Sequence, residues 1–237
     1  MERPYIICHM TMSLDGKVTG DFLADPACAP ATELYYQLHR DRKADGFACG
    51  RVTMEGSFTG GWYPDLSGYA PAPGWRWKMD YIPDSLSGFY AVAFDPHGRL
   101  GWKSPRIMDP DEDPGYHRAQ IIEVLTADID PRYTGYLEDK GIAYIFAGET
   151  EIDLEAALMK LRNFFGIQML LLEGGSILNG AFQRAGLVDE LSLVVAPMAA
   201  NAGDKPLFMD STLERYALMD AQNHDGILHL SYRRNRG

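Results

Sequence analysis

The sequence is poor in cysteine and in long apolar runs. Its 237 residues include three cysteines, Cys8, Cys28 and Cys49, which cannot all pair and which match no metal-binding spacing. Cys8 and Cys49 lie in apolar runs that we interpret as neighbouring buried strands. Free thiols are typical of a reducing compartment, and the N-terminus shows no signal-peptide pattern, so we expect a cytoplasmic protein. No run approaches the roughly 20 apolar residues that cross a bilayer, which predicts no membrane partner.

The chain also lacks a basic surplus and the common catalytic motifs. It carries 22 Lys and Arg against 33 Asp and Glu, a net charge of −11, whereas nucleic acids bind basic surfaces. We therefore expect no nucleic-acid partner. There is no G-x-S-x-G nucleophile turn, no Walker loop and no H-E-x-x-H motif. The acidic stretch 105–117 lacks the spacing of a calcium loop, so we expect a solvated loop there and no metal site.

The segment 169–197 carries the clearest positive signal. Four consecutive apolar residues at 169–172 predict a strand that is buried on both faces. Gly174 and Gly175 then allow a sharp turn, and residues 176–184 have apolar side chains at helical spacing. A glycine turn that opens a helix leaves free N–H groups at the positive end of the helix dipole, which favours a bound phosphate. The segment therefore predicts a nucleotide cofactor.

The rest of the chain alternates strand and helix patterns. The predicted strands are residues 5–10, 45–49, 90–94, 121–125, 142–146, 191–196, 217–222 and 227–233. The predicted helices are residues 31–43, a short one through Glu55, 131–140, and 154–165 with Asp153 as N-cap. This order predicts an α/β fold, a three-layer α/β/α sandwich with a mixed, mostly parallel sheet and a C-terminal antiparallel hairpin. No composition break resembles a linker, so we expect one domain over 1–237. His9, at the end of the first strand, is interpreted as a structural histidine.

An aromatic insertion at about 59–88 interrupts this alternation. It is rich in Gly and Pro and contains six Trp and Tyr residues, too many for a disordered linker. Loops of this length are uncommon unless they bind something. The sequence leaves three interpretations open: a lid over a planar ligand, a loop packed on its own domain, or a subunit contact.

Three motifs in order along the chain resemble one enzyme family. The segment 173–197, EGGSILNGAFQRAGLVDELSLVVAP, the loop 12–18, MSLDGKV, and the turn 50–55, GRVTME, are similar to the reductase domain of riboflavin biosynthesis, the RibD C-terminal family. That family has a dihydrofolate-reductase-like fold. The resemblance covers roughly residues 4–58 and 120–200.

The resemblance implies site residues at the matched positions. Those expected to bind the cofactor are Ser13, Gly50, Thr53, Glu173, Gly174, Gly175 and Ser176. Asp15 is expected to contact substrate or nicotinamide, as a hydrogen-bond acceptor or as a catalytic proton relay. Lys17 is expected to meet an anionic group of the substrate. A turn-stabilising role for Asp15 and a solvated Lys17 are the open alternatives.

Two departures from the family pattern bear on specificity. The family's D-D-P-x-L-x-x-R segment, whose cations hold a sugar phosphate, is missing here. Arg76 or Lys78 is the candidate to supply a cation for that phosphate instead. Pro96 stands where the family often has a serine near the 2′-phosphate of the cofactor, and proline donates no hydrogen bond. His97, Arg99 or Lys103 remains to neutralise that phosphate. We expect NADPH as cofactor, with NADH as the alternative.

The resemblance therefore predicts an NADPH-dependent reductase that transfers hydride to a small heterocyclic substrate. The implied reaction is that of 5-amino-6-(5-phosphoribosylamino)uracil reductase. Two alternatives are left. One is a pterin or dihydrofolate-type reductase, which would need a helix acid like the carboxylate of the folate enzymes, and Glu33 is the candidate for it. The other is a non-catalytic nucleotide-binding relative. The H-x-E and P-C-x-x-C motifs of the family's deaminase domain are absent, so we expect a stand-alone reductase. A homodimer is also implied, paired through the strand 191–196 or through the insertion.

Overall fold

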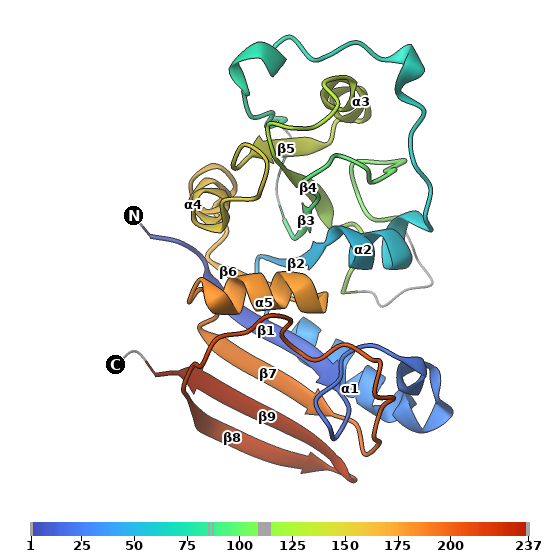
Figure 1. Cartoon of the computed structure of the whole chain (residues 1–237), viewed down its shortest axis with the longest axis vertical. Helices are drawn as coiled ribbons and strands as arrows, with labels where there is room; N and C mark the ends of the chain where they lie inside the picture. The colour runs from blue at the N-terminus through green and yellow to red at the C-terminus, as the bar shows by residue number, and fades with distance from the viewer. Residues whose placement is uncertain (1, 85, 87, 109–114, 236–237) are drawn as a thin grey trace. The chain divides into compact units, whose positions relative to one another are not determined.

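The computed structural model describes residues 2–84, 86, 88–108 and 115–235 (Figure 1). Its contacts divide the chain into two compact units, each discontinuous in sequence. Unit 1 is Met1–Pro4 with Asp45–Gln168, and unit 2 is Tyr5–Ala44 with Met169–Gly237. Each unit is described by itself, and a single domain over 1–237 stays a prediction. Every predicted strand and helix is present, with its boundaries within two residues of those expected.

Unit 1 contains four parallel strands in the order β2-β3-β4-β5. The strands are β2 Gly46–Gly50, β3 Tyr90–Phe94, β4 Gln120–Leu125 and β5 Ala143–Phe146. The helices are α2 Arg51–Met54, which continues as one π-helical turn Glu55–Thr59, α3 Arg132–Lys140 and α4 Leu154–Phe165. All residues of β3, β4 and β5 are buried, which explains the apolar sequences of β3 and β5, whereas β4 also buries Gln120 and Glu123. Asp153 caps α4 as predicted, because its carboxylate accepts a 2.9 Å hydrogen bond from the N–H of Ala156.

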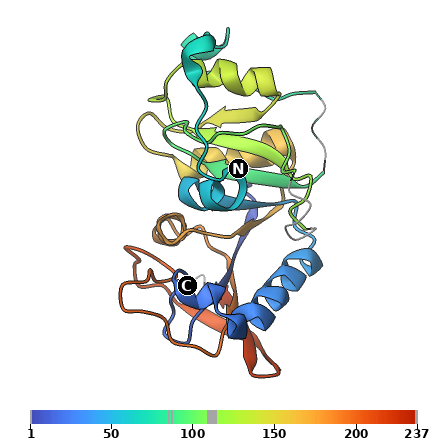
Figure 2. The same ribbon diagram turned by 90° about the vertical axis from the view of Figure 1, so that its right-hand side faces the viewer.

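Unit 2 contains a mixed sheet in the order β6-β1-β7-β9-β8. The strands are β1 Tyr5–Met12, β6 Met169–Leu172, β7 Glu190–Val195, β8 Tyr216–His224 and β9 Ile227–Arg234. The first three are parallel, and β8 and β9 form the predicted C-terminal antiparallel hairpin. Helices α1 Ala29–Asp41 and α5 Ser176–Arg184 lie on opposite faces of this sheet (Figures 1 and 2). The mixed, mostly parallel α/β class is thus confirmed.

The cysteines are free and buried, as expected, but one interpretation of their strands is wrong. Cys8 on β1 and Cys49 on β2 do not lie on neighbouring strands, because β1 pairs with β6 on one side and with β7 on the other. Sequence periodicity identifies buried strands but gives no information on their order. Within the described residues, no group of three His, Cys, Asp or Glu side chains is arranged to hold a metal ion. The acidic residues Asp109, Asp111, Glu112 and Asp113 lie outside the described part of the chain.

No helix in the described ranges is long and apolar enough to cross a membrane.

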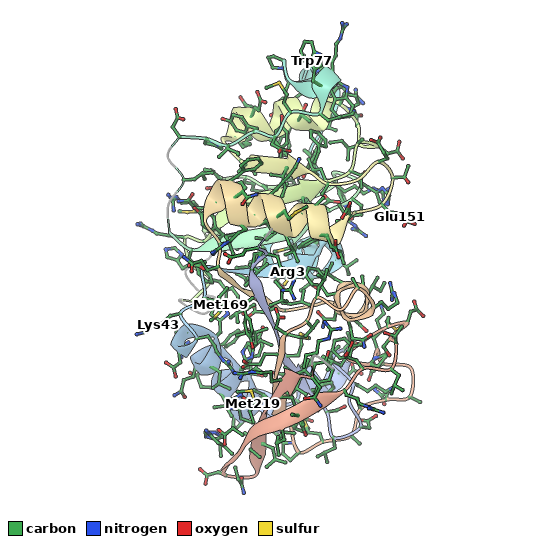
Figure 3. The ribbon with its side chains drawn as sticks, turned by 90° about the vertical axis from the view of Figure 1, so that its left-hand side faces the viewer. Arg3, Lys43, Trp77, Glu151, Met169 and Met219 are labelled. Carbon is green, nitrogen blue, oxygen red and sulfur yellow. The ribbon has the colours of Figure 1, made fainter. Side chains whose placement is uncertain are left out.

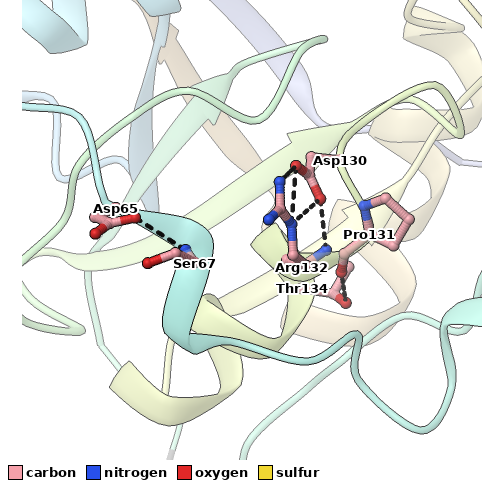
Figure 4. Close-up of polar contacts among 6 residues, drawn as sticks. All are labelled: Asp65, Ser67, Asp130, Pro131, Arg132 and Thr134. Carbon is pink, nitrogen blue, oxygen red and sulfur yellow. Dashed lines mark hydrogen bonds and ion pairs between the residues drawn. The ribbon is translucent and has the colours of Figure 1, made fainter.

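The aromatic insertion packs on its own unit where the structure describes it. Tyr81 pairs with Tyr144 of β5 through backbone hydrogen bonds of 2.9 and 3.0 Å. The N–H of Ala72 donates to the hydroxyl of Thr134 on α3, and that hydroxyl donates in turn to the Pro131 carbonyl (Figure 4). Trp77, in contrast, is 73% exposed and projects outward (Figure 3). These contacts correspond to the self-packed interpretation, and residues 85 and 87 of the insertion lie outside the described residues.

A buried hydrogen-bond chain joins three strands of unit 2. The Nε2 of His9 lies 3.0 Å from the carbonyl oxygen of Tyr35, so Nε2 carries the hydrogen. The Nδ1 of His9 therefore accepts from the hydroxyl of Ser192, at 3.0 Å. That hydroxyl oxygen accepts in turn from the Nε2 of His229, also at 3.0 Å. His9 is thus a structural histidine, as predicted, and its neutral form has every hydrogen bond satisfied.

Burial lowers the pKa of His9 from 6.5 to about 4, which predicts a pH-dependent stability. Between these two values the unfolded chain binds a proton at His9 and the folded chain does not. The contribution of neutral, buried His9 to the free energy of unfolding is therefore complete above pH 6.5 and is lost as the pH falls towards 4. Lowering the pH from 7 to 5 should remove about 2 kcal/mol of the free energy of unfolding through this residue.

Urea titrations followed by circular dichroism at several pH values measure this effect. His9→Gln should flatten the dependence between pH 7 and 5, and His224→Gln, a change at an exposed histidine of β8, should leave it unchanged. An equal slope in wild-type and His9→Gln proteins would show that His9 is not the group that titrates.

Candidate functional site

The Gly174-Gly175 turn joins β6 to α5 in unit 2. Gly174 has φ +100°, a conformation that residues with a Cβ rarely adopt, and the peptide bond between the two glycines is cis. Gly175 is extended and precedes the first residue of α5, and its carbonyl accepts from the N–H of Asn179 at 3.0 Å. The turn therefore presents backbone without side chains at the start of a nine-residue helix. This geometry is suited to a phosphate or pyrophosphate.

The side chain of Glu173 points into the interior of unit 2. Its Oε1 lies 2.7 Å from the Nδ1 of His39, which is in the last turn of α1. Glu173 is 6% exposed and His39 is 3% exposed. Glu173 can therefore meet a ligand only through its backbone, whereas its carboxylate anchors the strand end that precedes the glycines. Sequence patterns gave no signal for His39, because it lies 134 residues from Glu173.

Ser176 is also turned inward, towards the segment that follows β7. Its hydroxyl donates to the carbonyl of Pro206, and its own carbonyl accepts from the N–H of Met209 at 3.0 Å. Gly180 lets this segment approach closely, because a Cβ there would lie 1.8 Å from the Met209 carbonyl oxygen. The segment 206–209 thus fixes α5 in place, and the Ser176 hydroxyl is engaged within unit 2.

The loop after β1 brings Ser13, Asp15 and Lys17 together. Ser13 is fully buried, and its hydroxyl donates to Asp15 at 2.7 Å and accepts from the N–H of Lys17 at 2.9 Å. Gly16 supplies the positive φ of +78° at which the loop turns back. Two backbone hydrogen bonds, from Val18 to Lys205 and from Leu207 to Gly16, tie the loop to the segment that also braces α5. Ser13 therefore shapes the loop, and Asp15 and Lys17 are its exposed and half-exposed charges.

Asp15 is held in its ionised form. The Ser13 hydroxyl and the N–H of Ala200 both donate to its Oδ1, and these hydrogen bonds lower the pKa of the carboxyl. A lowered pKa suits a hydrogen-bond acceptor for a substrate N–H or amino group and disfavours a proton donor near neutral pH. The predicted turn-stabilising role and the predicted ligand contact are compatible, because the second carboxylate oxygen is not used by either donor.

In unit 1, two loops follow adjacent parallel strands and lie side by side. Gly50 pairs with Phe94, so the turn into α2 and the loop after β3 begin at the same edge of the sheet. Gly50 is extended and caps α2, and Thr53 lies half-buried in the first turn of that helix. Arg51, which follows Gly50 directly, forms an ion pair with Glu55. Arg51 is a cation at this edge that the motif contained but the sequence analysis did not single out.

The loop after β3 buries an acid and exposes the side chains of a histidine and an arginine. Asp95 is fully buried, and its Oδ2 accepts from the N–H groups of Arg99 and Leu100 at 2.5 and 2.9 Å. Burial raises the pKa of Asp95. Asp95 thus shapes the loop, while the side chains of His97 and Arg99 are exposed. Both residues are among the three candidates named for the 2′-phosphate, and both side chains are accessible at the carboxyl end of β3.

Two other candidates from the sequence have different roles. The Nζ of Lys78 lies 3.0 Å from the ring centroid of Trp75 and donates to the Ala127 carbonyl at 3.2 Å, so it is engaged within unit 1. The side chain of Glu33 is 72% exposed and pairs with Arg40. An exposed surface acid does not match the ligand-facing carboxylate on which the pterin-type alternative depended.

The predicted site residues therefore form two sets. The loop Ser13–Lys17 and the turn Glu173–Ser176 belong to unit 2, and the turn Gly50–Thr53 belongs to unit 1. Each set lies at the carboxyl ends of parallel strands, which is where open α/β sheets bind ligands. The ligand contacts of all these residues stay predictions.

The chain is similar to known proteins in sequence, and to solved structures in fold. The family profile described as RibD C-terminal domain matches residues 117–226. A 2,5-diamino-6-ribosylamino-4(3H)-pyrimidinone 5′-phosphate reductase from Methanothermobacter thermautotrophicus is 39% identical over 212 residues, which cover 88% of this chain and 84% of that protein. A protein of the same name from Aquifex aeolicus is 28% identical over 211 residues, 87% of this chain and 82% of that protein.

Among solved structures, RibD of Acinetobacter baumannii superposes with a TM-score of 0.66 at 20% sequence identity. The match covers 98% of this chain and 58% of the RibD chain. At this identity the likeness establishes the fold.

The His39–Glu173 hydrogen bond predicts a stability difference between two substitutions. His39→Leu removes the donor from a buried carboxylate and should lower the free energy of unfolding by about 1–3 kcal/mol. His39→Gln keeps a donor of similar reach and should lose less. Urea titration at pH 7 measures both, with His224→Leu on exposed β8 as the matched control. Equal losses for Leu and Gln would show that packing of the ring, not the hydrogen bond, stabilises this contact.

Proposed function

Because the chain belongs to the family of the RibD C-terminal domain, we propose that it is a reductase of riboflavin biosynthesis that uses NADPH. Its proposed substrate is 2,5-diamino-6-ribosylamino-4(3H)-pyrimidinone 5′-phosphate, reduced at the sugar C1′ to a ribityl product. The observation that carries this proposal is the 39% identical relative of that name, with 88% of this chain matched. The uracil compound implied by the sequence motifs differs at one ring position, carrying an oxo group in place of the 2-amino group.

Each unit by itself contains residues that fit a phosphate group of a nicotinamide nucleotide. In unit 2 the Gly174-Gly175 turn offers backbone N–H groups without side chains at the start of α5. In unit 1 the Gly50 turn and the cations Arg51 and Arg99 lie at one sheet edge. Both are suited to phosphate groups. The bound cofactor supplies the hydride, and the protein supplies binding and orientation.

Asp15 is the residue that we assign to substrate orientation. Its ionised carboxylate accepts hydrogen bonds, and the pyrimidine substrate carries N–H and amino donors. Lys17, two residues along the same loop, supplies a cation for an anionic group. The buried Ser13 holds the loop in the conformation that presents both side chains.

We also propose a homodimer in the cytoplasm. The predicted interface strand 191–196 is not available, because every residue of β7 is buried between β1 and β9. Within the described residues β8 pairs only with β9, and its Leu218 is 56% exposed. Met219, labelled in Figure 3, is 47% exposed. An open strand edge with exposed apolar side chains favours pairing with a second copy of the chain. The three free, buried thiols fit a reducing compartment.

An NADPH-oxidation assay with the pyrimidinone phosphate tests the proposed reaction. The wild-type protein should turn over, and Asp15→Asn should lower kcat/KM by about 10- to 100-fold, because a neutral amide is a weaker acceptor than a carboxylate. Asn keeps an oxygen for the Ser13 and Ala200 hydrogen bonds, so the loop should persist. Asp41→Asn, an exposed change at the end of α1, should have no effect. Tight NADPH binding without turnover would instead favour a non-catalytic nucleotide-binding protein.

Cofactor choice gives a separate prediction for Arg99. Arg99→Gln removes an exposed cation near the carboxyl end of β3 and should raise the KM for NADPH about tenfold, a loss of about 1.4 kcal/mol. The KM for NADH should stay unchanged, since NADH has no 2′-phosphate. Steady-state kinetics with both cofactors measure the difference. Parallel changes with both cofactors would remove Arg99 from phosphate recognition.

A further inference from the structure

Unit 1 contains a pocket of about 260 Å³ away from the predicted phosphate turn. It lies between the π-helical turn that ends at Thr59 and the segment 101–108. The predicted cofactor residues Gly50 and Thr53 are at the opposite end of the same helical stretch. Among the described residues that line the pocket, Lys103 is one of the three candidates named above for the 2′-phosphate of the cofactor, and the others lie outside the predicted cofactor and substrate set. Its volume lies just below the roughly 300–1,000 Å³ of sites for drug-sized ligands, which indicates a smaller occupant.

The inner wall of the pocket is apolar and fixed. The ring of Phe58 packs against Phe47 and Tyr116, with centroids 5.7 and 5.8 Å away. Trp102 is 3% exposed, and its indole N–H donates to Glu123. Ile107 completes the wall and is 4% exposed. Because these side chains are held by neighbours outside the pocket, the wall is preformed for a flat apolar group.

The rim of the pocket is cationic. Lys103 is exposed, and its Nζ lies 5.8 Å from the ring centroid of Trp62. Arg106 donates to the Arg118 carbonyl at 3.2 Å, which holds its guanidinium near the rim. Ser104 adds a hydroxyl, and none of the described lining residues is acidic. In a chain of net charge −11, the two cations Lys103 and Arg106 at one rim are suited to an anionic ligand.

An acid, Glu123, lies behind the wall and is held by a hydrogen bond. Glu123 is fully buried on β4, and its carboxylate accepts from the Trp102 indole. Burial, together with the nearby Asp95, raises the pKa of Glu123 well above its usual value. Among the described residues, the charged side chains at the rim of the pocket are therefore those of Lys103 and Arg106.

We infer that this pocket binds a small aromatic anion, a single planar ring that carries a phosphate or carboxylate group, at a site separate from the cofactor. The ring lies against Phe58 and Trp102. The anionic group meets Lys103, Arg106 and the hydroxyl of Ser104. Such a ligand would bind the reductase without taking part in hydride transfer, so the pocket is a second small-molecule site.

Phenyl phosphate is the probe that tests this inference. Isothermal titration should show saturable binding of one molecule per chain, with phenol and inorganic phosphate each binding more weakly. Lys103→Gln and Arg106→Gln should each weaken phenyl phosphate about tenfold, as expected for loss of one charged hydrogen bond. Arg118→Gln, a neighbouring exposed cation outside the pocket lining, should leave binding unchanged.

The same titrations with saturating NADPH separate this site from the cofactor site. Phenyl phosphate affinity should be unchanged, and the Kd for NADPH should stay within about twofold in both pocket variants. Competition with NADPH, or an NADPH affinity that falls in Lys103→Gln while phenyl phosphate is unaffected, would assign these residues to the cofactor and overturn the inference. Absence of saturable phenyl phosphate binding to the folded wild-type protein would also overturn it, whatever the outcome of the reductase assay.

Discussion

Parallel strand pairing with both faces covered is the constraint on which the rest of each unit depends. Because β3, β4, β5 and β7 are buried along their whole length, their side chains are committed to packing. Chemistry is then confined to the loops at the strand ends. In unit 2 these are the loop after β1 and the turn after β6, and in unit 1 the turn after β2 and the loop after β3. The residues expected to bind ligands are found in these four places.

Buried polar groups lie directly beneath these loops and hold them. Glu173 is anchored to His39 before the Gly174-Gly175 turn, and Asp95 accepts two backbone N–H groups of the loop after β3. A buried carboxylate is costly unless such donors satisfy it, so each anchor specifies one loop conformation. The side chains of Glu173 and Asp95 therefore hold the loops, and the contacts of these loops with a ligand stay predictions.

The charged side chains are likewise divided into buried acids and cations at the loops. The chain is acidic as a whole, yet Arg51, His97 and Arg99 gather at one edge of unit 1, and Lys103 and Arg106 line a pocket further along the same unit. Burial raises the pKa of both Asp95 and Glu123, the acids that lie beneath these side chains. Local cation pairs can therefore attract phosphates in a protein whose net charge would repel them.

The sequence alone determined the elements of this protein, the glycine turn and the family. These are local signals: the all-apolar run at β6, the helical spacing of α5 and α4, and the motifs at Ser13–Lys17 and Gly50–Thr53 need no knowledge of distant residues. Tertiary structure decided what those residues face. Only folding brings His39 to Glu173 across 134 positions, encloses β7 between β1 and β9, and joins Phe58 to Trp102 in one pocket. Periodicity records which face of an element is buried, but the partner against which it is buried depends on strand order, and no local pattern encodes that order.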